Sequence, residues 1–207
     1  MRVLLFNGSP RPNGCTYTAL TEIAGVLNTE GIETELLQIG QKPVRDCIAC
    51  RKCNRVNSCV FDDDIVSEWL KKSEGADGFI FGSPVYFSHP TGMILSAMDR
   101  MFFCRKDLFA YKPAAAVVSA RRGGSIATLD VLTKYFPNGQ MPVPGSTYWN
   151  IVYGMTPDEV KQDLEGMQTM RNLGRNMAWL LKCLEAGKAA GIKLPEAEGG
   201  QVTNFIR

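Results

Sequence analysis

The stretch that most constrains the fold is the first part of the chain, residues 4–18. A short apolar run ends at Phe6, the loop NGSPRPNG follows over residues 7–14, and a helical pattern begins at about Cys15. This order predicts a buried strand, a tight loop and a helix N-terminus, where unpaired backbone N–H groups and a partial positive charge favour an anion. We therefore expect a phosphate group to bind here and the rest of the fold to be arranged around it.

The overall composition argues against several classes of protein. The chain of 207 residues is long enough for one α/β domain with a substantial core, and 23 basic against 21 acidic residues give a formal net charge of +2. So balanced a charge argues against nucleic acid or an anionic membrane as a partner. No apolar run approaches the ~20 residues that a membrane span requires, and the early Pro/Gly loop is unlike a signal peptide. We expect a cytoplasmic protein whose seven cysteines stay reduced.

Strand-like and helix-like segments alternate along most of the chain, which is typical of a parallel sheet with helices on both faces. Five strands are predicted, at residues 2–7, 32–39, 77–82 and 114–119 and from 141–143 onward. Helices are predicted at residues 15–29, 65–70, 92–104, 125–136 and 156–186. We expect a doubly wound α/β fold in which a domain of residues 1–187 carries a cysteine-rich insertion at 40–63 and is followed by a tail at 188–207.

Three of the predicted loops follow strands and therefore lie at the same edge of the sheet. They are residues 8–14, 83–91 and 120–124, and doubly wound folds bind ligands at this edge. The first loop offers hydroxyl groups and an arginine suited to phosphate, the second an apolar wall, and the third paired glycines that let a ligand approach the backbone. Each loop alone is equally consistent with an ordinary turn. The first loop lacks GxxxxGK[ST], which argues against a nucleotide triphosphatase.

The segments NGSPRPNGCT, GSPVYFSHPTG and SARRGG together resemble the flavodoxin-like NAD(P)H-dependent FMN reductases, over residues 1–180. The resemblance implies a flavodoxin-like doubly wound sheet of five parallel strands with helices on both faces, an FMN cofactor, and NAD(P)H as a transient donor. The residues implied to bind the FMN phosphate are Ser9, Arg11, Asn13, Gly14, Cys15 and Thr16. Those implied to line the flavin ring are Pro84, Val85, Tyr86, Phe87 and Ser88. Those implied to meet its pyrimidine edge are Ser119, Arg121, Arg122, Gly123 and Gly124.

Cys15 departs from the pattern of the family, which usually has a polar residue just before the threonine. The substitution removes one side-chain contact to the phosphate. The resemblance also implies a homodimer or homotetramer, with the flavins near the subunit interface.

Four cysteines lie close together in the pattern C-x2-C-x2-C-x5-C, namely Cys47, Cys50, Cys53 and Cys59. Four thiolates in so short a stretch can hold an iron–sulfur cluster, although the last gap differs from the ferredoxin pattern. A zinc site is a weaker candidate, because structural zinc usually pairs two C-x2-C knuckles across a longer spacer. The pattern resembles the compact motif of iron–sulfur flavoproteins, a branch of the same family, which implies a [4Fe–4S] cluster held by these cysteines near the FMN. The two cysteines in helical stretches, Cys104 and Cys183, are expected to be buried small hydrophobic residues.

These features predict an FMN-dependent oxidoreductase that passes electrons from NAD(P)H or a reduced ferredoxin-like donor to a small-molecule or protein acceptor. Two alternatives stay open from the sequence. One is a non-enzymatic electron-transfer flavoprotein, and the other is a zinc-stabilised module that binds a phosphate ligand. Because the cofactors carry the chemistry, no protein acid or base is expected to be catalytic.

Overall fold

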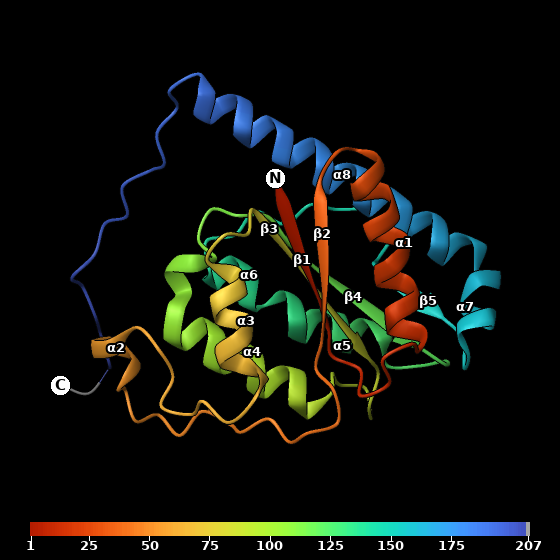
Figure 1. The fold of residues 1–207 in the computed structure, drawn as a ribbon, viewed down its shortest axis with the longest axis horizontal. Coiled ribbons are helices and arrows are strands. Elements are labelled where there is room, and N and C mark those ends of the chain that lie inside the picture. Colours follow the sequence, from red (N-terminus) through yellow and green to blue (C-terminus); the bar gives the residue numbers. More distant parts are fainter. Residues whose placement is uncertain (206–207) are drawn as a thin grey trace.

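The computed structural model describes residues 1–205, and its centre is a five-stranded parallel sheet with the order β2-β1-β3-β4-β5 (Figure 1). The order reverses beside β1, because β2 lies on one side of it and the later strands on the other. This confirms the predicted doubly wound flavodoxin-like fold. The strands are β1 (Arg2–Asn7), β2 (Glu33–Gln38), β3 (Gly78–Pro84), β4 (Ala114–Ala120) and β5 (Ile151–Tyr153).

Helices cover both faces of this sheet (Figure 1). One face carries α1 (Cys15–Thr29), α7 (Pro157–Gln162) and α8 (Leu164–Ala189). The other carries α3 (Ile65–Ser73), α4 (Gly92–Arg105), α5 (Ser125–Thr133) and α6 (Tyr135–Asn138). Two shorter elements complete the described chain, α2 (Cys53–Val56) within the cysteine-rich segment and the 3-10 turn η1 (Lys106–Leu108).

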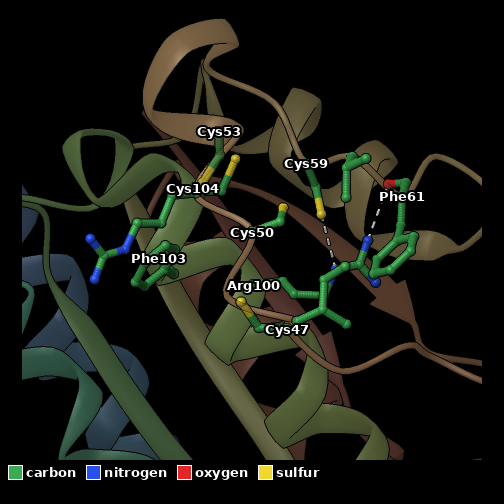
Figure 2. Close-up of a pocket in the computed structure, with 11 residues that line it drawn as sticks. Cys47, Cys50, Cys53, Cys59, Phe61, Arg100, Phe103 and Cys104 are labelled. Atoms are coloured by element: carbon green, nitrogen blue, oxygen red, sulfur yellow. Dashed lines mark hydrogen bonds between the residues drawn. The ribbon is translucent and has the colours of Figure 1, made fainter.

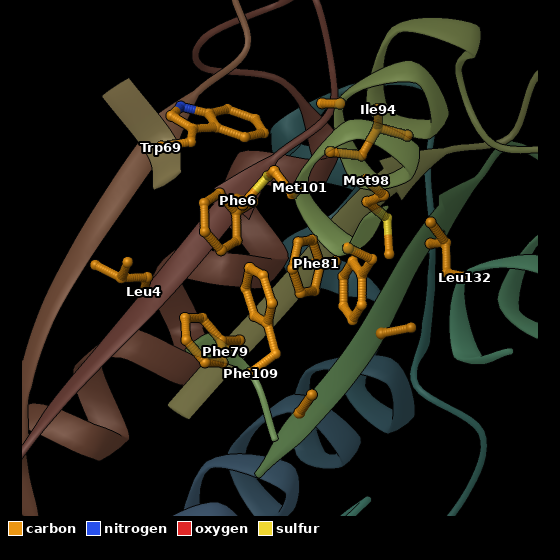
Figure 3. Packing of buried hydrophobic residues seen from close by; sticks show 14 of the residues in the cluster. Leu4, Phe6, Trp69, Phe79, Phe81, Ile94, Met98, Met101, Phe109 and Leu132 are labelled. Atoms are coloured by element: carbon orange, nitrogen blue, oxygen red, sulfur yellow. The ribbon is translucent and has the colours of Figure 1, made fainter. Parts of the chain in front are cut away.

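The strands contribute side chains to two separate hydrophobic cores, because successive side chains of a strand point to opposite faces of the sheet. Val3 and Leu5 of β1 pack toward α1 and α8, whereas Leu4 and Phe6 pack toward α3 and α4. The second core is aromatic, and the rings of Phe6 and Phe81 stack with their centroids 4.6 Å apart (Figure 3). A sheet buried on both faces requires apolar residues at nearly every strand position, which is why β1 and β3 read as continuous apolar runs.

Side-chain caps determine where several helices begin. Asp64 accepts a hydrogen bond from the backbone N–H of Val66 at the start of α3, as its position before an apolar stripe predicts. Asp163 divides the helix predicted over residues 156–186 into α7 and α8. Its carboxylate accepts from the N–H of Gly166 at 2.9 Å and from the N–H of Tyr153 at 2.7 Å, so it both caps α8 and joins that helix to β5.

The prediction of the fifth strand at residues 141–143 is wrong. This segment contributes one backbone hydrogen bond to β4, from the N–H of Ala114 to the carbonyl of Pro142, and prolines at 142 and 144 have no N–H to continue a ladder. The fifth strand is formed by Ile151–Tyr153, which pairs in parallel with residues 118–120 of β4. The helix predicted at 125–136 is also divided, into α5 and α6.

After α8 the chain continues to residue 205 without a helix or strand, and the final two residues of the predicted tail at 188–207 lie outside the described residues. Figure 1 shows this segment running along one side of the molecule, away from the sheet. Within residues 1–205, no helix is both long enough and apolar enough to cross a membrane.

The tight packing at the end of β1 gives a test of the fold. A Cβ at Gly8 would lie 2.7 Å from Cβ of Ile94 and 2.8 Å from the carbonyl oxygen of Gly82. Gly8→Ala should therefore lower the free energy of unfolding by about 1–3 kcal/mol, the usual cost of overpacking. The measurement is urea unfolding followed by circular dichroism. In the control Gly92→Ala the added Cβ meets nothing within 4 Å, so stability should hold or rise slightly. Equal unfolding midpoints for both variants would count against the packing described.

Candidate functional site

The loops that follow β1, β3 and β4 converge over one end of the sheet, as the sequence predicts. Together with residues after β5 they form a pocket with an empty volume of about 700 Å³ that is open to solvent. The lining residues are Ser9, Arg11, Gly14, Cys15, Thr16, Pro84, Val85, Tyr86, Ser119, Ala120, Arg121, Gly154 and Met155.

The structure places the remaining predicted contacts outside this lining, and their binding roles stay predictions. They are Asn13, Phe87, Ser88, Arg122, Gly123 and Gly124. Three lining residues, Ala120, Gly154 and Met155, were not among the predicted contacts. Ala120 lies between the predicted Ser119 and Arg121. Gly154 and Met155 follow β5 directly, so the misplaced fifth strand is what concealed these two.

The first loop is shaped by the buried amide of Asn7. Its Oδ1 accepts from the N–H of Ser9 at 3.1 Å, and its Nδ2 donates to Oε1 of Gln38 on β2 at 2.6 Å. The hydroxyl of Ser9 in turn accepts from the N–H of Arg11 at 3.2 Å. These bonds hold the loop against the sheet and leave the guanidinium of Arg11 on the pocket side.

The N-terminus of α1 opens into the same pocket. Its N-cap is Gly14, which provides no side-chain hydrogen bond, and the first turn contains no acidic residue. The first N–H groups of a helix have no partner within it, so here they are available to a bound anion that no carboxylate displaces. Glycine at 82 allows this close approach, because a Cβ there would lie 2.9 Å from Cγ2 of Thr16.

Two further contacts fix α1 relative to the ends of β4 and β5. The hydroxyl groups of Thr16 and Ser119 share a buried hydrogen bond of 2.8 Å. The Sγ of Cys15 donates to the carbonyl of Gly154 at 3.6 Å. Burial raises the pKa of the Cys15 thiol, which favours the neutral form. A neutral thiol does not repel an anion at the helix N-terminus, so the replacement of a polar residue by Cys15 is compatible with phosphate binding.

The second loop forms a tight turn at residues 86–89. Tyr86 and His89 exchange backbone hydrogen bonds of 2.8 and 3.0 Å, and Phe87 and Ser88 between them have φ of 51° and 60°. Such left-handed conformations cost roughly 1–3 kcal/mol each in residues other than glycine. Glycine at 124 lets the third loop touch this turn, since a Cβ there would lie 2.7 Å from Cα of Ser88. The turn leaves Phe87 in solvent and Tyr86 in the pocket wall.

A second, smaller pocket is formed between the cysteine-rich segment and α4 (Figure 2). It is lined by all four cysteines of the C-x2-C-x2-C-x5-C pattern, together with Cys104, and has an empty volume of about 330 Å³. Ala49 and Arg51 both have positive φ, 52° and 55°, and these turns curl the segment around the pocket. Among residues 1–205, no three side chains of His, Cys, Asp or Glu lie close enough together to hold a single metal ion. The thiols surround the space instead of converging on one point.

The two helical cysteines differ from the expectation that both are buried hydrophobic residues. Cys104 is half-buried and belongs to the cysteine pocket beside Cys53 (Figure 2), and Cys183 is exposed on α8. Burial, followed by the neighbouring Cys53 and Cys59, raises the pKa of Cys104 to about 12. Cys104 is therefore a neutral thiol over the physiological range of pH.

Arg100 is a further member of the cysteine pocket that the sequence analysis missed. Its Nε donates to Sγ of Cys59 at 3.3 Å, a bond visible in Figure 2. Burial alone would lower the pKa of Arg100, but its hydrogen bonds to Asp64 and Cys59 outweigh burial and raise that pKa. Its position in the sequence could have indicated that Arg100 is buried, since an arginine between Met98 and Met101 falls close to the apolar stripe of the predicted helix.

A doubly wound parallel sheet with the strand order β2-β1-β3-β4-β5 and helices on both faces defines the flavodoxin-like class of proteins. A solved flavodoxin from the domain Archaea matches this fold with a TM-score of 0.59 at 12% sequence identity, covering 88% of this chain and 99% of that one.

The sequence profile of NADPH-dependent FMN reductases matches residues 1–156, and the chain belongs to this family of oxidoreductases. An iron-sulfur flavoprotein of Methanocaldococcus jannaschii is 35% identical over 196 residues, which cover 89% of this chain and 100% of the relative. An iron-sulfur flavoprotein of Methanosarcina thermophila is 26% identical over 193 residues, which cover 91% of this chain and 99% of the relative.

The position of Arg11 gives a test of the phosphate site. Arg11 lines the pocket beside the N-terminus of α1. A hydrogen bond to a charged group is worth about 1.5–3 kcal/mol, so Arg11→Ala should weaken FMN binding roughly 10- to 100-fold. This change is measured by titrating the metal-free protein with FMN and recording the quenching of flavin fluorescence. Arg175→Ala is the control, because Arg175 is exposed on α8 outside this pocket, and it should bind FMN as the wild type does. An unchanged affinity in Arg11→Ala would refute the phosphate assignment.

Proposed function

We propose that the protein is an FMN-dependent oxidoreductase that takes electrons from NAD(P)H or a reduced ferredoxin-like donor and passes them through FMN and a [4Fe–4S] cluster to an acceptor. The observation that carries this proposal is the convergence of three strand-end loops on an uncapped helix N-terminus, which suits a ligand with a phosphate at one end and a ring at the other.

The residues of the larger pocket fit FMN in chemistry. The free N–H groups of α1 and the guanidinium of Arg11 would hold the phosphate. The short apolar run of Pro84, Val85 and Tyr86 would provide a wall for the ring, and Arg121 also lines the pocket.

The residues of the smaller pocket fit an iron–sulfur cluster, because the four cysteines of the pattern line one space. Cluster cores contain several irons and sulfides, and so need a wider set of ligands. Arg51 and Arg100 both line the pocket, and the guanidinium of Arg100, which donates to Cys59, would offset part of the negative charge of the thiolates. The names of the relatives, as iron-sulfur flavoproteins, support the same assignment.

When bound, FMN would supply hydride acceptance and one-electron release, and a cluster would supply single-electron transfer. The chain itself positions these groups and controls access. Tyr86 and Met155 are 49% and 62% exposed at the edge of the larger pocket, so a flat donor such as a nicotinamide can reach the ring side from solvent. This open edge favours a turnover enzyme over a sealed carrier.

The activity is tested directly by anaerobic oxidation of NADH and NADPH with added FMN, using a quinone as acceptor. The proposal expects saturable oxidation of at least one nicotinamide, because the pocket edge is open to a donor. If FMN binds but neither nicotinamide is oxidised, the same protein is supplied with a reduced ferredoxin. Failure to reduce the bound flavin with all three donors would contradict the enzyme proposal and favour a different role for the flavin.

A separate test concerns the cysteine pocket. Cys53 is the buried member of the set, and Cys53→Ala should abolish bound iron after anaerobic reconstitution while FMN binding stays intact, since the two pockets share no residue. Iron and flavin are measured on the same sample. Cys183→Ala, which removes an exposed thiol on α8, is the control and should retain wild-type iron. Full iron content in Cys53→Ala would exclude this loop as the ligand set.

A further inference from the structure

Arg100 lies beneath the cysteine-rich segment with only 1% of its side chain exposed. It projects from α4, on which Ala97, Met98 and Met101 pack in the apolar core. Burying a guanidinium is unfavourable unless its charge and its N–H groups find partners. The partners of Arg100 therefore show what its burial achieves.

Every nitrogen of the guanidinium is used, and all the acceptors come from the segment around the cysteines. Nη1 donates to the carbonyl of Arg45 at 3.1 Å and to the carboxylate of Asp64. Nη2 donates to the carbonyl of Phe61 at 3.1 Å, and Nε donates to Sγ of Cys59 (Figure 2). The ring of Phe61 also lies 5.3 Å from the guanidinium carbon, within the range of a cation–π contact.

These acceptors lie on both sides of the cysteine pattern. Arg45 precedes the first cysteine by two residues, and Phe61 follows the last by two, so one side chain holds together the two ends of the segment that contains all four thiols. Asp64 reinforces this closure, because its carboxylate also accepts from the backbone N–H of Arg45 at 3.2 Å while capping α3. The segment is thereby closed on a rigid helix before any cluster is added.

We propose that Arg100 is a positioning residue that closes the cysteine loop and presents Cys59 as a ligand of the cluster. This inference rests on the proposed function for the identity of the cluster. Lysine cannot replace the guanidinium, because a single ammonium group at the end of a flexible stem cannot reach both carbonyls and the sulfur in a fixed plane. The bond to Cys59 has a second consequence, since an N–H donated to a ligating sulfur makes the cluster easier to reduce.

The test compares Arg100→Lys with Arg105→Lys in the full chain. Arg105 lies on the same helix and pairs with Glu74 and Asp107, outside the cysteine pocket. In the metal-free protein, hydrogen exchange of residues 45–61 should rise about tenfold or more in Arg100→Lys, because bonds to a charged donor are lost, and should not change in Arg105→Lys.

After anaerobic reconstitution, Arg100→Lys should hold less iron than the control, and the cluster that forms should have a more negative midpoint potential in an EPR-monitored redox titration. FMN binding should equal that of the wild type and serves as the measure of folding. If Arg100→Lys does not bind FMN, the double variant Arg100→Gln with Asp64→Asn removes the buried charges as a pair and should show the same faster exchange.

The outcomes separate this inference from the proposed function. Equal exchange at residues 45–61 in Arg100→Lys and Arg105→Lys would overturn the role of Arg100, whatever the iron content. Faster exchange with an unchanged midpoint potential and unchanged iron would overturn the presentation of Cys59. A wild-type protein that takes up no iron would overturn the cluster itself, and with it the ligand role of Cys59.

Discussion

The uncapped N-terminus of α1, held against the end of β1, is the constraint on which the larger site depends. The residues around it allow α1 to lie close to the end of the sheet. Glycines at 8 and 82 remove the Cβ atoms that would keep α1 and α4 away, and the hydrogen bond between Thr16 and Ser119 joins the first turn of α1 to β4. The helix can then offer its free N–H groups to an anion with no competing carboxylate. In this way the topology of the sheet brings a helix terminus that favours anions to the ends of the strands.

A single helix, α4, connects the two candidate sites. At its start, the hydroxyl of Thr91 donates to the carbonyl of Gly8 at 2.8 Å and so supports the first loop of the larger pocket. Nine residues further along, Arg100 supports the cysteine segment. At 1.5 Å per residue the two supports are roughly 13 Å apart along the helix axis. Because α4 packs its apolar face into the aromatic core, both sites rest on the same rigid element, and their separation is set by the fold.

The sequence predicts the doubly wound sheet well because buried parallel strands are short apolar runs between helical patterns. The first, third and fourth strands have this form, whereas the second, at the edge of the sheet, alternates loosely. It also predicts that three loops converge, since the loops follow parallel strands. The fifth strand was misplaced because Met141 to Val143 is apolar, whereas the prolines beside it prevent pairing. That error concealed Gly154 and Met155 in the pocket. The role of Arg100 could not be predicted from the sequence, because its partners lie 36 to 55 residues away along the chain and only folding brings them together.

The central claim is that one end of the sheet holds FMN and the cysteine loop holds an iron–sulfur cluster. It is tested most directly by the visible absorbance spectrum of anaerobically purified and reconstituted protein, recorded with its flavin, iron and zinc contents. The account predicts flavin bands over a broad iron–sulfur absorbance, with one FMN and about four irons per chain and no zinc. Colourless protein that fails to bind added FMN would contradict the flavin site, and stoichiometric zinc in place of iron would contradict the cluster.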